Sequence, residues 1–175
     1  MKIKDKTFTP LLPAEEIAAK VNTLARQINK DYKGTKPLFI AILNGSFIFA
    51  ADLLKEIDLE CEVSFVKLSS YSEMTSSGTV KELIGINENI FNRDVIIIED
   101  IVDTGNTMRV VLDEFRDRGV KSVEIVSLLV KPEALVNSID IKYVGFEIPN
   151  RFVVGYGLDY DGFGRNTKAI YQIKA

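Results

Sequence analysis

The run Val95–Thr107 contains the side chains best suited to chemistry; it reads Val-Ile-Ile-Ile-Glu-Asp-Ile-Val-Asp-Thr-Gly-Asn-Thr. Glu99 and Asp100 follow a short apolar, β-branched stretch, which is typical of a strand buried on both faces of a parallel sheet. We therefore expect the strand to end at these acids, at the carboxyl edge of the sheet, where open α/β sheets bind their ligands. Carboxylates there can bind sugar hydroxyls or a hard cation such as Mg²⁺.

The residues after the acids are suited to binding a phosphate. Residues 104–107, Thr-Gly-Asn-Thr, lead into a helix-like segment from Met108 to Arg118. A helix N-terminus and a glycine-containing loop present backbone N–H groups to an anion, and the threonine hydroxyls are further donors. Acids repel a phosphate unless they bind a sugar or a cation, so the run predicts a site for a phosphorylated sugar with a metal ion.

Proton transfer near neutral pH must use carboxylates or lysines, because the chain contains no histidine. This absence removes the usual general base, the serine–histidine nucleophile pair and most zinc sites. The net charge of −3 and the pI near 5.2 argue against a broad nucleic-acid surface. Small molecules are therefore the expected partners, and no nucleic acid is expected among them.

The single cysteine, Cys61, cannot form an internal disulfide and is expected to be a core-facing strand residue. No apolar segment follows the charged residues 1–6, and no run approaches the ~18 apolar residues that a membrane span needs. We expect a cytoplasmic protein that does not bind a membrane.

One domain of alternating strands and helices is expected to position the site, since 175 residues suffice for one ordinary core and are too few for two. Apolar residues spaced by three and four predict an amphipathic helix from Pro13 to Tyr32. Right-handed crossovers between the later segments give a parallel α/β sheet. These segments are strands at Leu38–Leu43, Cys61–Leu68, Val80–Ile86, Val95–Ile98 and Ser122–Val130, helices at Phe47–Ile57 and Arg109–Arg118, and short strands from Ile141 onward.

The Val95–Thr107 run resembles the motif with which type I phosphoribosyltransferases bind 5-phosphoribosyl-1-pyrophosphate (PRPP). The wider chain is similar to the hypoxanthine and hypoxanthine-guanine phosphoribosyltransferases. The resemblance implies one domain, with a parallel-sheet core at about residues 13–140 and a small hood at about residues 141–175 to which the N-terminus contributes. The segments that narrow the resemblance are Leu43–Ser46, Ser70–Tyr71, Ser127–Lys131, Val144–Pro149, Arg151–Tyr156 and Leu158–Tyr160.

The resemblance implies a purine salvage reaction in which a ring nitrogen of a 6-oxopurine displaces pyrophosphate from C1 of PRPP. Hypoxanthine gives IMP in such a reaction, and guanine gives GMP. The implied cofactor is Mg²⁺, and the implied assembly is a homodimer or homotetramer. A site of this kind must hold both substrates in line, stabilise separated charges and accept a proton from the purine.

The resemblance assigns Glu99 and Asp100 to the ribose hydroxyls and, together with PRPP, to Mg²⁺. Asp103 corresponds to the proton acceptor, a role suited to a partly desolvated carboxylate. The alternative for Asp103 is a loop residue that caps the next helix. The residues assigned to the 5′-phosphate are Asp103, Thr104, Gly105, Asn106 and Thr107.

Pyrophosphate is assigned by the resemblance to the turn after the Leu38–Leu43 strand and to Arg165. Backbone N–H groups of Asn44 and Gly45 are the implied donors, and a cis peptide bond between Leu43 and Asn44 is implied as well. By residue type alone, an Asn-Gly pair is an ordinary turn.

The purine is assigned by the resemblance to Lys131, Phe152, Val153 and Asp159. Lys131 donates to the 6-oxo group and selects against a 6-amino group. Phe152 stacks on the base, and the main chain at Val153 binds the ring edge. Asp159 corresponds to a residue near the purine 2-position and a second metal ion. The alternatives are a surface lysine for Lys131 and a core phenylalanine for Phe152.

The polar segment Ser69–Gly78 is expected to be a mobile loop. Within it, Ser70 and Tyr71 resemble the loop that closes over the reacting centre of the family and excludes water.

Two other functions stay open at this point. The first is a regulator that keeps the PRPP-binding fold to sense nucleotides while it binds RNA or DNA; the acidic balance and the lack of an extra helical domain count against it. The second is a transferase of the same fold that acts on adenine, xanthine, orotate or uracil. Lys131 together with Phe152 and Val153 favours a 6-oxopurine.

Overall fold

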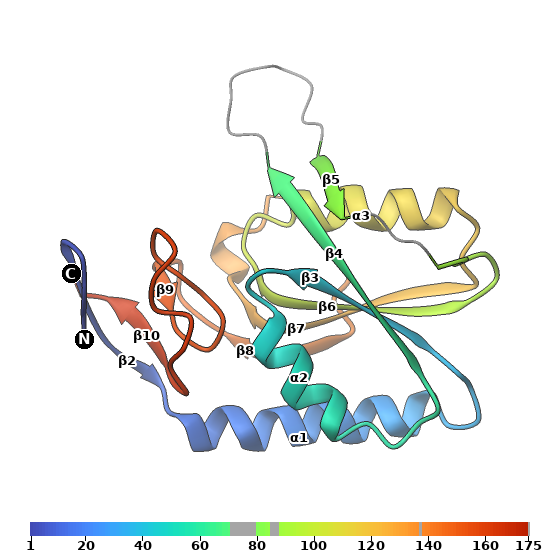
Figure 1. Cartoon of the computed structure of the whole chain (residues 1–175), viewed down its shortest axis with the longest axis horizontal. Helices are drawn as coiled ribbons and strands as arrows, with labels where there is room; N and C mark the ends of the chain where they lie inside the picture. Colours follow the sequence, from blue (N-terminus) through green and yellow to red (C-terminus); the bar gives the residue numbers. More distant parts are fainter. Residues whose placement is uncertain (71–79, 85–87, 137, 175) are drawn as a thin grey trace.

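A computed structural model of the chain describes residues 1–70, 80–84, 88–136 and 138–174. Figure 1 shows a large sheet flanked by helices, with a smaller sheet at one end. The elements are β1 (Lys2–Ile3), β2 (Lys6–Leu12), α1 (Ala14–Asp31), β3 (Leu38–Leu43), α2 (Phe47–Lys55), β4 (Glu62–Ser70), β5 (Val80–Ile84), β6 (Asp94–Val102), α3 (Asn106–Asp117), β7 (Ser122–Val130), the 3₁₀ helix η1 (Pro132–Ala134), β8 (Tyr143–Glu147), β9 (Val153–Val154) and β10 (Ile170–Ile173).

The large sheet has the strand order β5-β4-β3-β6-β7-β8. Strands β4, β3, β6, β7 and β8 are parallel, which confirms the predicted α/β sheet. The exception is β5, which pairs antiparallel with β4. The nine residues between these two strands are too few for a parallel crossover, which takes about a dozen residues or more, so the strand returns in the opposite direction.

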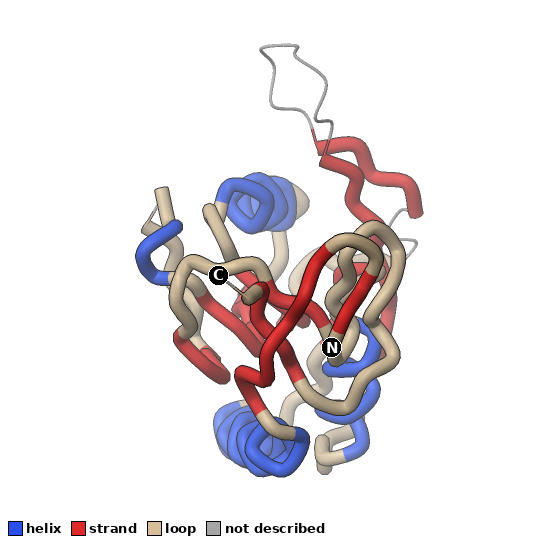
Figure 2. Tube along the Cα trace, turned by 90° about the vertical axis from the view of Figure 1, so that its left-hand side faces the viewer, coloured by secondary structure: helices blue, strands red, loops and turns tan. Residues whose placement is uncertain are grey.

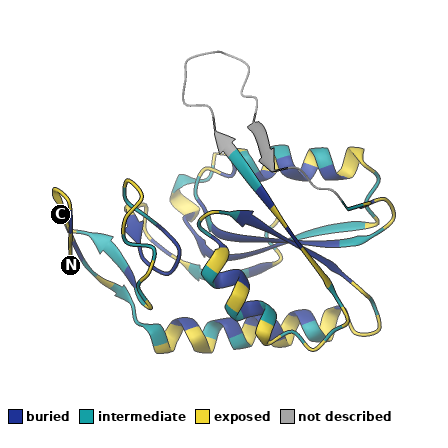
Figure 3. Ribbon diagram, viewed as in Figure 1, coloured by how far each residue is buried: buried dark blue, intermediate teal, exposed yellow. Residues whose placement is uncertain are grey.

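Helices cover both faces of this sheet, with α1 and α2 on one face and α3 on the other (Figure 1). Alternate residues of β3 therefore enter two different cores: Phe39 and Ala41 pack with α1 and α2, whereas Ile40 packs with residues of α3. Strands β3 and β6 are buried along most of their length (Figure 3). Burial on both faces explains why these strands are continuous apolar runs in the sequence.

Helix α1 spans Ala14–Asp31, within one residue at each end of the predicted helix. Its buried face contains the apolar residues whose spacing predicted it, Ile17, Val21, Leu24 and Ile28. Its length of 18 residues includes several charged side chains, and no helix in the described ranges is long and apolar enough to cross a membrane.

Strand β6 continues beyond the point at which it was predicted to end. The prediction placed its last residue at Ile98, but Glu99 and Asp100 lie within the strand, which ends at Val102. The reason is unequal pairing, because β3 pairs with β6 only as far as Ile98, whereas β7 continues to pair as far as Val102. The two acids therefore lie just past the end of the β3 pairing.

A second, antiparallel sheet with the order β1-β2-β10-β9 forms the hood. Figure 2 views the molecule from the hood side, with helices of the larger sheet above and below. The small core of the hood contains Ile3, Phe8 and Val154, so residues from both ends of the chain pack together.

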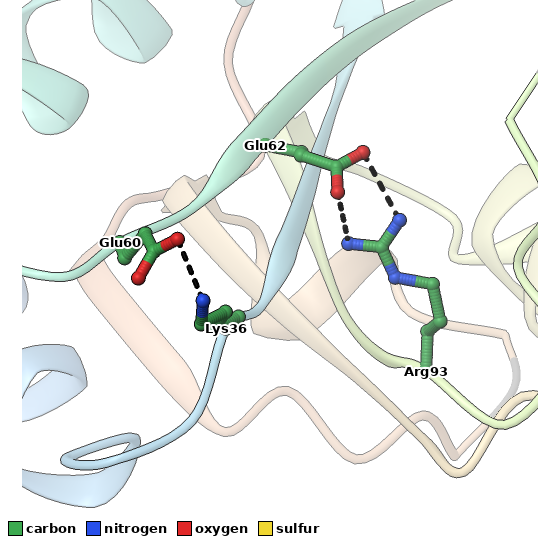
Figure 4. A network of polar contacts seen from close by, with 4 residues as sticks. All are labelled: Lys36, Glu60, Glu62 and Arg93. Carbon is green, nitrogen blue, oxygen red and sulfur yellow. Dashed lines mark hydrogen bonds and ion pairs between the residues drawn. The ribbon is translucent and has the colours of Figure 1, made fainter.

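Exposed ion pairs lie at the amino ends of the parallel strands of the large sheet (Figure 4). Lys36 Nζ lies 2.7 Å from Glu60 Oε1, and Arg93 donates to both carboxylate oxygens of Glu62 at 3.0 and 3.1 Å. Exposed ion pairs of this kind contribute little to stability, about 0–1 kcal/mol each.

Cys61 lies just before β4 and is partly buried against the core. The prediction that it faces the core is confirmed, and the prediction that it lies within a strand is wrong.

Candidate active site

Two hollows open at the carboxyl edge of the large sheet. The first, about 240 Å³ in volume, lies between the end of β6 and the start of α3. The residues that line it are Ile42, Leu68, Glu99, Asp100, Ile101, Val102, Asp103, Thr104, Gly105, Thr107 and Met108.

The second hollow, about 280 Å³ in volume, lies between this edge and the hood. It shares Asp100, Ile101 and Asp103 with the first hollow, so the acidic end of β6 borders both. Its lining residues are Gly45, Asp100, Ile101, Asp103, Lys131, Phe152, Val153, Leu158, Asp159 and Arg165.

Glu99 and Asp100 are 7% and 8% exposed, an unusual degree of burial for two adjacent carboxyl groups. Burial, with the neighbouring Asp100 as a second cause, raises the pKa of the Glu99 carboxyl well above its usual range. Backbone donors partly compensate, since the Asp100 N–H donates to Glu99 Oε1 at 3.2 Å and the Ile101 N–H donates to Asp100 Oδ1 at 3.0 Å. This pair of carboxyls therefore favours any ligand that brings positive charge or hydroxyl donors.

Asp103 forms an ion pair with Lys131, whose Nζ lies 2.6 Å from Asp103 Oδ2. The lysine side chain is 8% exposed and that of the aspartate 47%, so the cation is largely buried and the carboxylate faces the hollow. Neighbouring parallel strands bring the two together, because Val102 and Val130 are paired at the ends of β6 and β7. The pairing was not predicted, although a charged residue directly after each of two adjacent strands was a visible signal for it.

The loop between β6 and α3 ends at Gly105, which has a left-handed φ of 79° and precedes the first residue of α3. A Cβ at Gly105 would lie 2.7 Å from Ile139 Cδ1, so the position is also crowded. Asp103 does not cap the helix, because Gly105 is the N-cap residue and Asp103 binds Lys131 instead. The Asn106 N–H, at the first residue of α3, donates to Thr104 Oγ1 at 3.4 Å, and a helix N-terminus is in general a favourable place for an anion.

The turn after β3 lies against the acidic end of β6. The Leu43–Asn44 peptide bond is cis, as the resemblance implied. A Cβ at Gly45 would overlap the carboxylate of Asp100, and a Cβ at Gly157 would overlap the carbonyl oxygen of Gly45. The backbone of Gly45 is therefore enclosed between β6 and the hood, in a space that admits no side chain.

The hood supplies an aromatic wall to the second hollow. The side chain of Phe152 is 46% exposed, and its ring meets Tyr160 edge-on at 5.8 Å between centroids and Phe8 at 6.4 Å. Arg165 also borders this hollow, with Nη2 2.7 Å from Asp159 Oδ1 and Nη1 donating to the carbonyl oxygen of Gly157 at 2.7 Å. An exposed aromatic face and a cation thus border the same hollow as the Asp103–Lys131 pair.

The family model "Phosphoribosyl transferase domain" matches residues 9–161. The chain belongs to this family. It is 46% identical to the hypoxanthine-guanine phosphoribosyltransferase of Streptococcus mutans over 165 residues, which cover 94% of this chain and 92% of that protein. The corresponding protein of Bacillus subtilis is 44% identical over the same shares of the two chains.

Solved structures of phosphoribosyltransferases have the same fold. A hypoxanthine phosphoribosyltransferase from Staphylococcus aureus superposes with a TM-score of 0.91 at 41% identity, covering 98% of this chain and 93% of that chain. A hypoxanthine-guanine phosphoribosyltransferase from Bacillus anthracis, crystallised with HEPES in its active site, gives 0.90 at 37% identity and covers 97% and 99%. The type I phosphoribosyltransferase fold is confirmed.

Most residues that the resemblance assigned to this phosphoribosyltransferase site border one of the two hollows. Asn44 and Asn106 are exposed beside them, at the turn after β3 and at the start of α3. The predicted lid lies outside the described residues, because the structure describes only the backbone of Ser70 and does not describe Tyr71. The individual roles of all the assigned residues stay predictions. Gly157, which contacts the turn after β3 from the hood, was not named from the sequence, and Tyr156 was named only within the Arg151–Tyr156 segment, without a role of its own.

The enclosure of Gly45 gives a testable prediction. Gly45→Ala places a methyl group where the Asp100 carboxylate lies, so the carboxylate must move. A misplacement of about 1 Å can lower a rate by ~10²-fold, and we expect kcat/KM for the phosphorylated substrate to fall by about that factor. The measurement is steady-state kinetics beside a thermal melt.

Gly34→Ala is the control for this variant. Gly34 has a φ of 80° and open space around it, so alanine there strains the backbone far from the site. It should lower the melting temperature and leave kcat/KM unchanged. A Gly45→Ala protein with parental kinetics would show that the Asp100 position is not critical.

Proposed function

We propose that the chain transfers the 5-phosphoribosyl group from PRPP to a 6-oxopurine, hypoxanthine and also guanine, with release of pyrophosphate. The observation that supports this most is the junction of two unlike hollows at one acidic strand end. The first combines carboxylates with the N-terminus of α3, which suits a sugar phosphate. The second combines an exposed phenylalanine with a buried lysine, which suits a flat base with a carbonyl group.

In this proposal the ribose lies over the end of β6, between the two hollows. The carboxyls of Glu99 and Asp100 accept hydrogen bonds from its hydroxyls, and negative charge there stabilises the positive charge that develops on the ribose as pyrophosphate leaves. The 5′-phosphate lies at residues 104–107, and the backbone of Gly45 and the guanidinium of Arg165 face the pyrophosphate. Both ends of PRPP are then fixed, so that C1 is presented to the purine.

Asp103 accepts the proton from the purine ring nitrogen. Before the base binds, Asp103 forms an ion pair with Lys131. Because the lysine ammonium group has three N–H donors, Lys131 can donate to the 6-oxo group while it still contacts the Asp103 carboxylate. A 6-amino group offers no acceptor to the ammonium group, and this disfavours adenine. The Phe152 ring stacks on the base, with Asp159 near its 2-position.

Mg²⁺ belongs to the proposal as the cofactor. Phosphoribosyltransferases generally use it. The residues fit, because two adjacent buried carboxyls crowd like charges that a hard cation relieves. Among the described residues no group of three or more acidic or thiol side chains is placed to hold a metal, so Glu99 and Asp100 would hold it with oxygens of PRPP, and Asp159 is assigned to a second ion. When bound, the ion neutralises charge on the leaving pyrophosphate.

The proposal includes a cytoplasmic location and assembly into homodimers or homotetramers. Sedimentation of the purified protein measures the assembly directly.

Initial rates with PRPP and a panel of bases test the proposed function. We expect nucleotide formation from hypoxanthine and guanine, slower formation from xanthine, and none above background from adenine or uracil, since Lys131 recognises a 6-oxo group on a purine. Equal rates with adenine would contradict the proposed role of Lys131. No nucleotide from any base, in a chain that binds nucleotides and shifts RNA or DNA at low salt, would favour a regulator.

Asp103→Asn tests the general base. The amide keeps the shape of the side chain and cannot accept the proton, so we expect turnover at pH 7 to fall by ~10²-fold or more with little change in PRPP affinity. Asp94→Asn is a matched control, because Asp94 is the first residue of β6, at the end away from Asp103, and forms a 2.8 Å ion pair with Lys121. Loss of activity in both variants alike would assign the effect to β6 and not to proton transfer.

Removal of metal tests the cofactor. Excess EDTA should abolish turnover and added Mg²⁺ should restore it, whereas NaCl of equal ionic strength should not, since screening does not replace a coordinated cation. Turnover that persists in EDTA would refute the assignment.

A further inference from the structure

A partly buried hydrogen bond joins the hood to α2, the helix that follows the turn assigned to pyrophosphate. The hydroxyl of Tyr156, a residue of the hood, donates to Asp52 Oδ2 on α2 at 2.7 Å. Tyr156 is 5% exposed, and burial raises its pKa, so the hydroxyl stays protonated and acts as a donor. Asp52 also lies 2.7 Å from Lys55 Nζ, which keeps the acceptor charged.

Tyr156 lies in a turn whose backbone is tightly constrained. Gly155, Tyr156 and Gly157 have φ values of 100°, 52° and 103°, and a residue with a side chain rarely adopts a positive φ. The Gly157 backbone packs directly on the Gly45 carbonyl. The turn that contains Tyr156 is therefore in contact with the turn after β3.

The same hood turn also holds Arg165. The Gly157 N–H donates to the carbonyl oxygen of Arg165 at 2.9 Å, and Arg165 Nη1 donates to the carbonyl oxygen of Gly157 at 2.7 Å. Both groups assigned to pyrophosphate, the Gly45 backbone and the Arg165 guanidinium, thus contact Gly157. Helix α2 begins two residues after Gly45, so Asp52 and Gly45 belong to one continuous segment.

We propose that the Tyr156–Asp52 hydrogen bond is a positioning device that sets the separation of Gly45 and Arg165, and with it the binding of the pyrophosphate end of PRPP. Tyr156 is a positioning residue, since it acts through Gly157. This inference rests on the proposed function.

The aromatic wall of the second hollow, to which the purine is assigned, is held independently of the Tyr156–Asp52 hydrogen bond. Val153 and Val154 pair with Gln172 and Tyr171 of β10, and the Ile173 N–H donates to the carbonyl oxygen of Phe152 at 2.8 Å. The Phe152 ring also packs on Phe8 and Tyr160. Loss of the Tyr156 hydroxyl should therefore change the pyrophosphate end and leave the base end nearly unchanged.

The chain contains a matched control for the hydrogen bond. The hydroxyl of Tyr143, 3% exposed, donates to Asp31 Oδ2 at 2.8 Å, and Lys142 lies beside that carboxylate. The side chains of Asp31 and Asp52 are each 38% exposed. Tyr143 is the first residue of β8, the outermost strand of the large sheet, and it borders neither of the two hollows. Tyr143→Phe thus removes an equivalent hydrogen bond at a distance from the site.

Tyr156→Phe and Tyr143→Phe are compared in steady-state assays with PRPP and hypoxanthine. We expect Tyr156→Phe to raise KM for PRPP and the inhibition constant of pyrophosphate about tenfold, and KM for hypoxanthine less than about twofold. Tyr143→Phe should change none of these, although both variants should lose a similar few degrees of melting temperature. Asp52→Ala should reproduce the Tyr156→Phe kinetics, and the double variant should add nothing further.

Each other outcome overturns the inference. Parental PRPP and pyrophosphate constants in Tyr156→Phe exclude a positioning role, and equal rises in the PRPP and hypoxanthine constants indicate a general loosening of the hood. Additive effects of Tyr156→Phe and Asp52→Ala separate the two residues. If Tyr156→Phe does not fold, the Asp52→Ala kinetics decide alone. A parent chain that forms no nucleotide refutes the proposed function itself, whereas an active parent with unchanged variants refutes only this inference.

Discussion

Two adjacent carboxyls, Glu99 and Asp100, lie almost out of water, and burial of such charges is unfavourable without compensation. Backbone N–H donors provide part of this compensation. The turn after β3 lies so close to the Asp100 carboxylate that only glycine fits at residue 45. The remaining compensation must come from what binds there. The arrangement of the edge, with a helix N-terminus on one side and the hood on the other, is thus organised around a charge that the protein alone does not fully stabilise.

The Asp103–Lys131 pair supplies the opposite case, a charge that is balanced before any ligand arrives. The buried lysine is satisfied by the carboxylate at 2.6 Å, so neither group needs a substrate for its stability. A base that enters beside them competes with an existing contact and must offer an acceptor of its own. In the proposed function, discrimination between bases then follows from the hydrogen-bonding edge of the ligand more than from the size of the hollow.

Local patterns predicted the core well, because strand and helix periodicity are set by near neighbours. The α1 helix and β3 were predicted to within a residue. The predicted end of β6 was wrong, because the strand end depends on how far each of the neighbouring strands β3 and β7 pairs with β6. The Tyr156–Asp52 bond joins residues 104 positions apart, and no short pattern in the sequence encodes such a contact. The resemblance to a family located the candidate site in the sequence. The contacts that support the site could be found only from the folded structure.

The hood closes the chain upon itself, because β2 pairs with β10 and the Lys174 N–H donates to the carbonyl oxygen of Thr7 (Figure 1). During synthesis all strands of the large sheet therefore emerge before β10, while Phe8 on β2 must wait for β10 to complete the hood. Until then the crevice has its acidic edge and lacks its aromatic wall. Synthesis thus passes through a stage in which the acidic end of β6 is present before the hollow between this edge and the hood is complete.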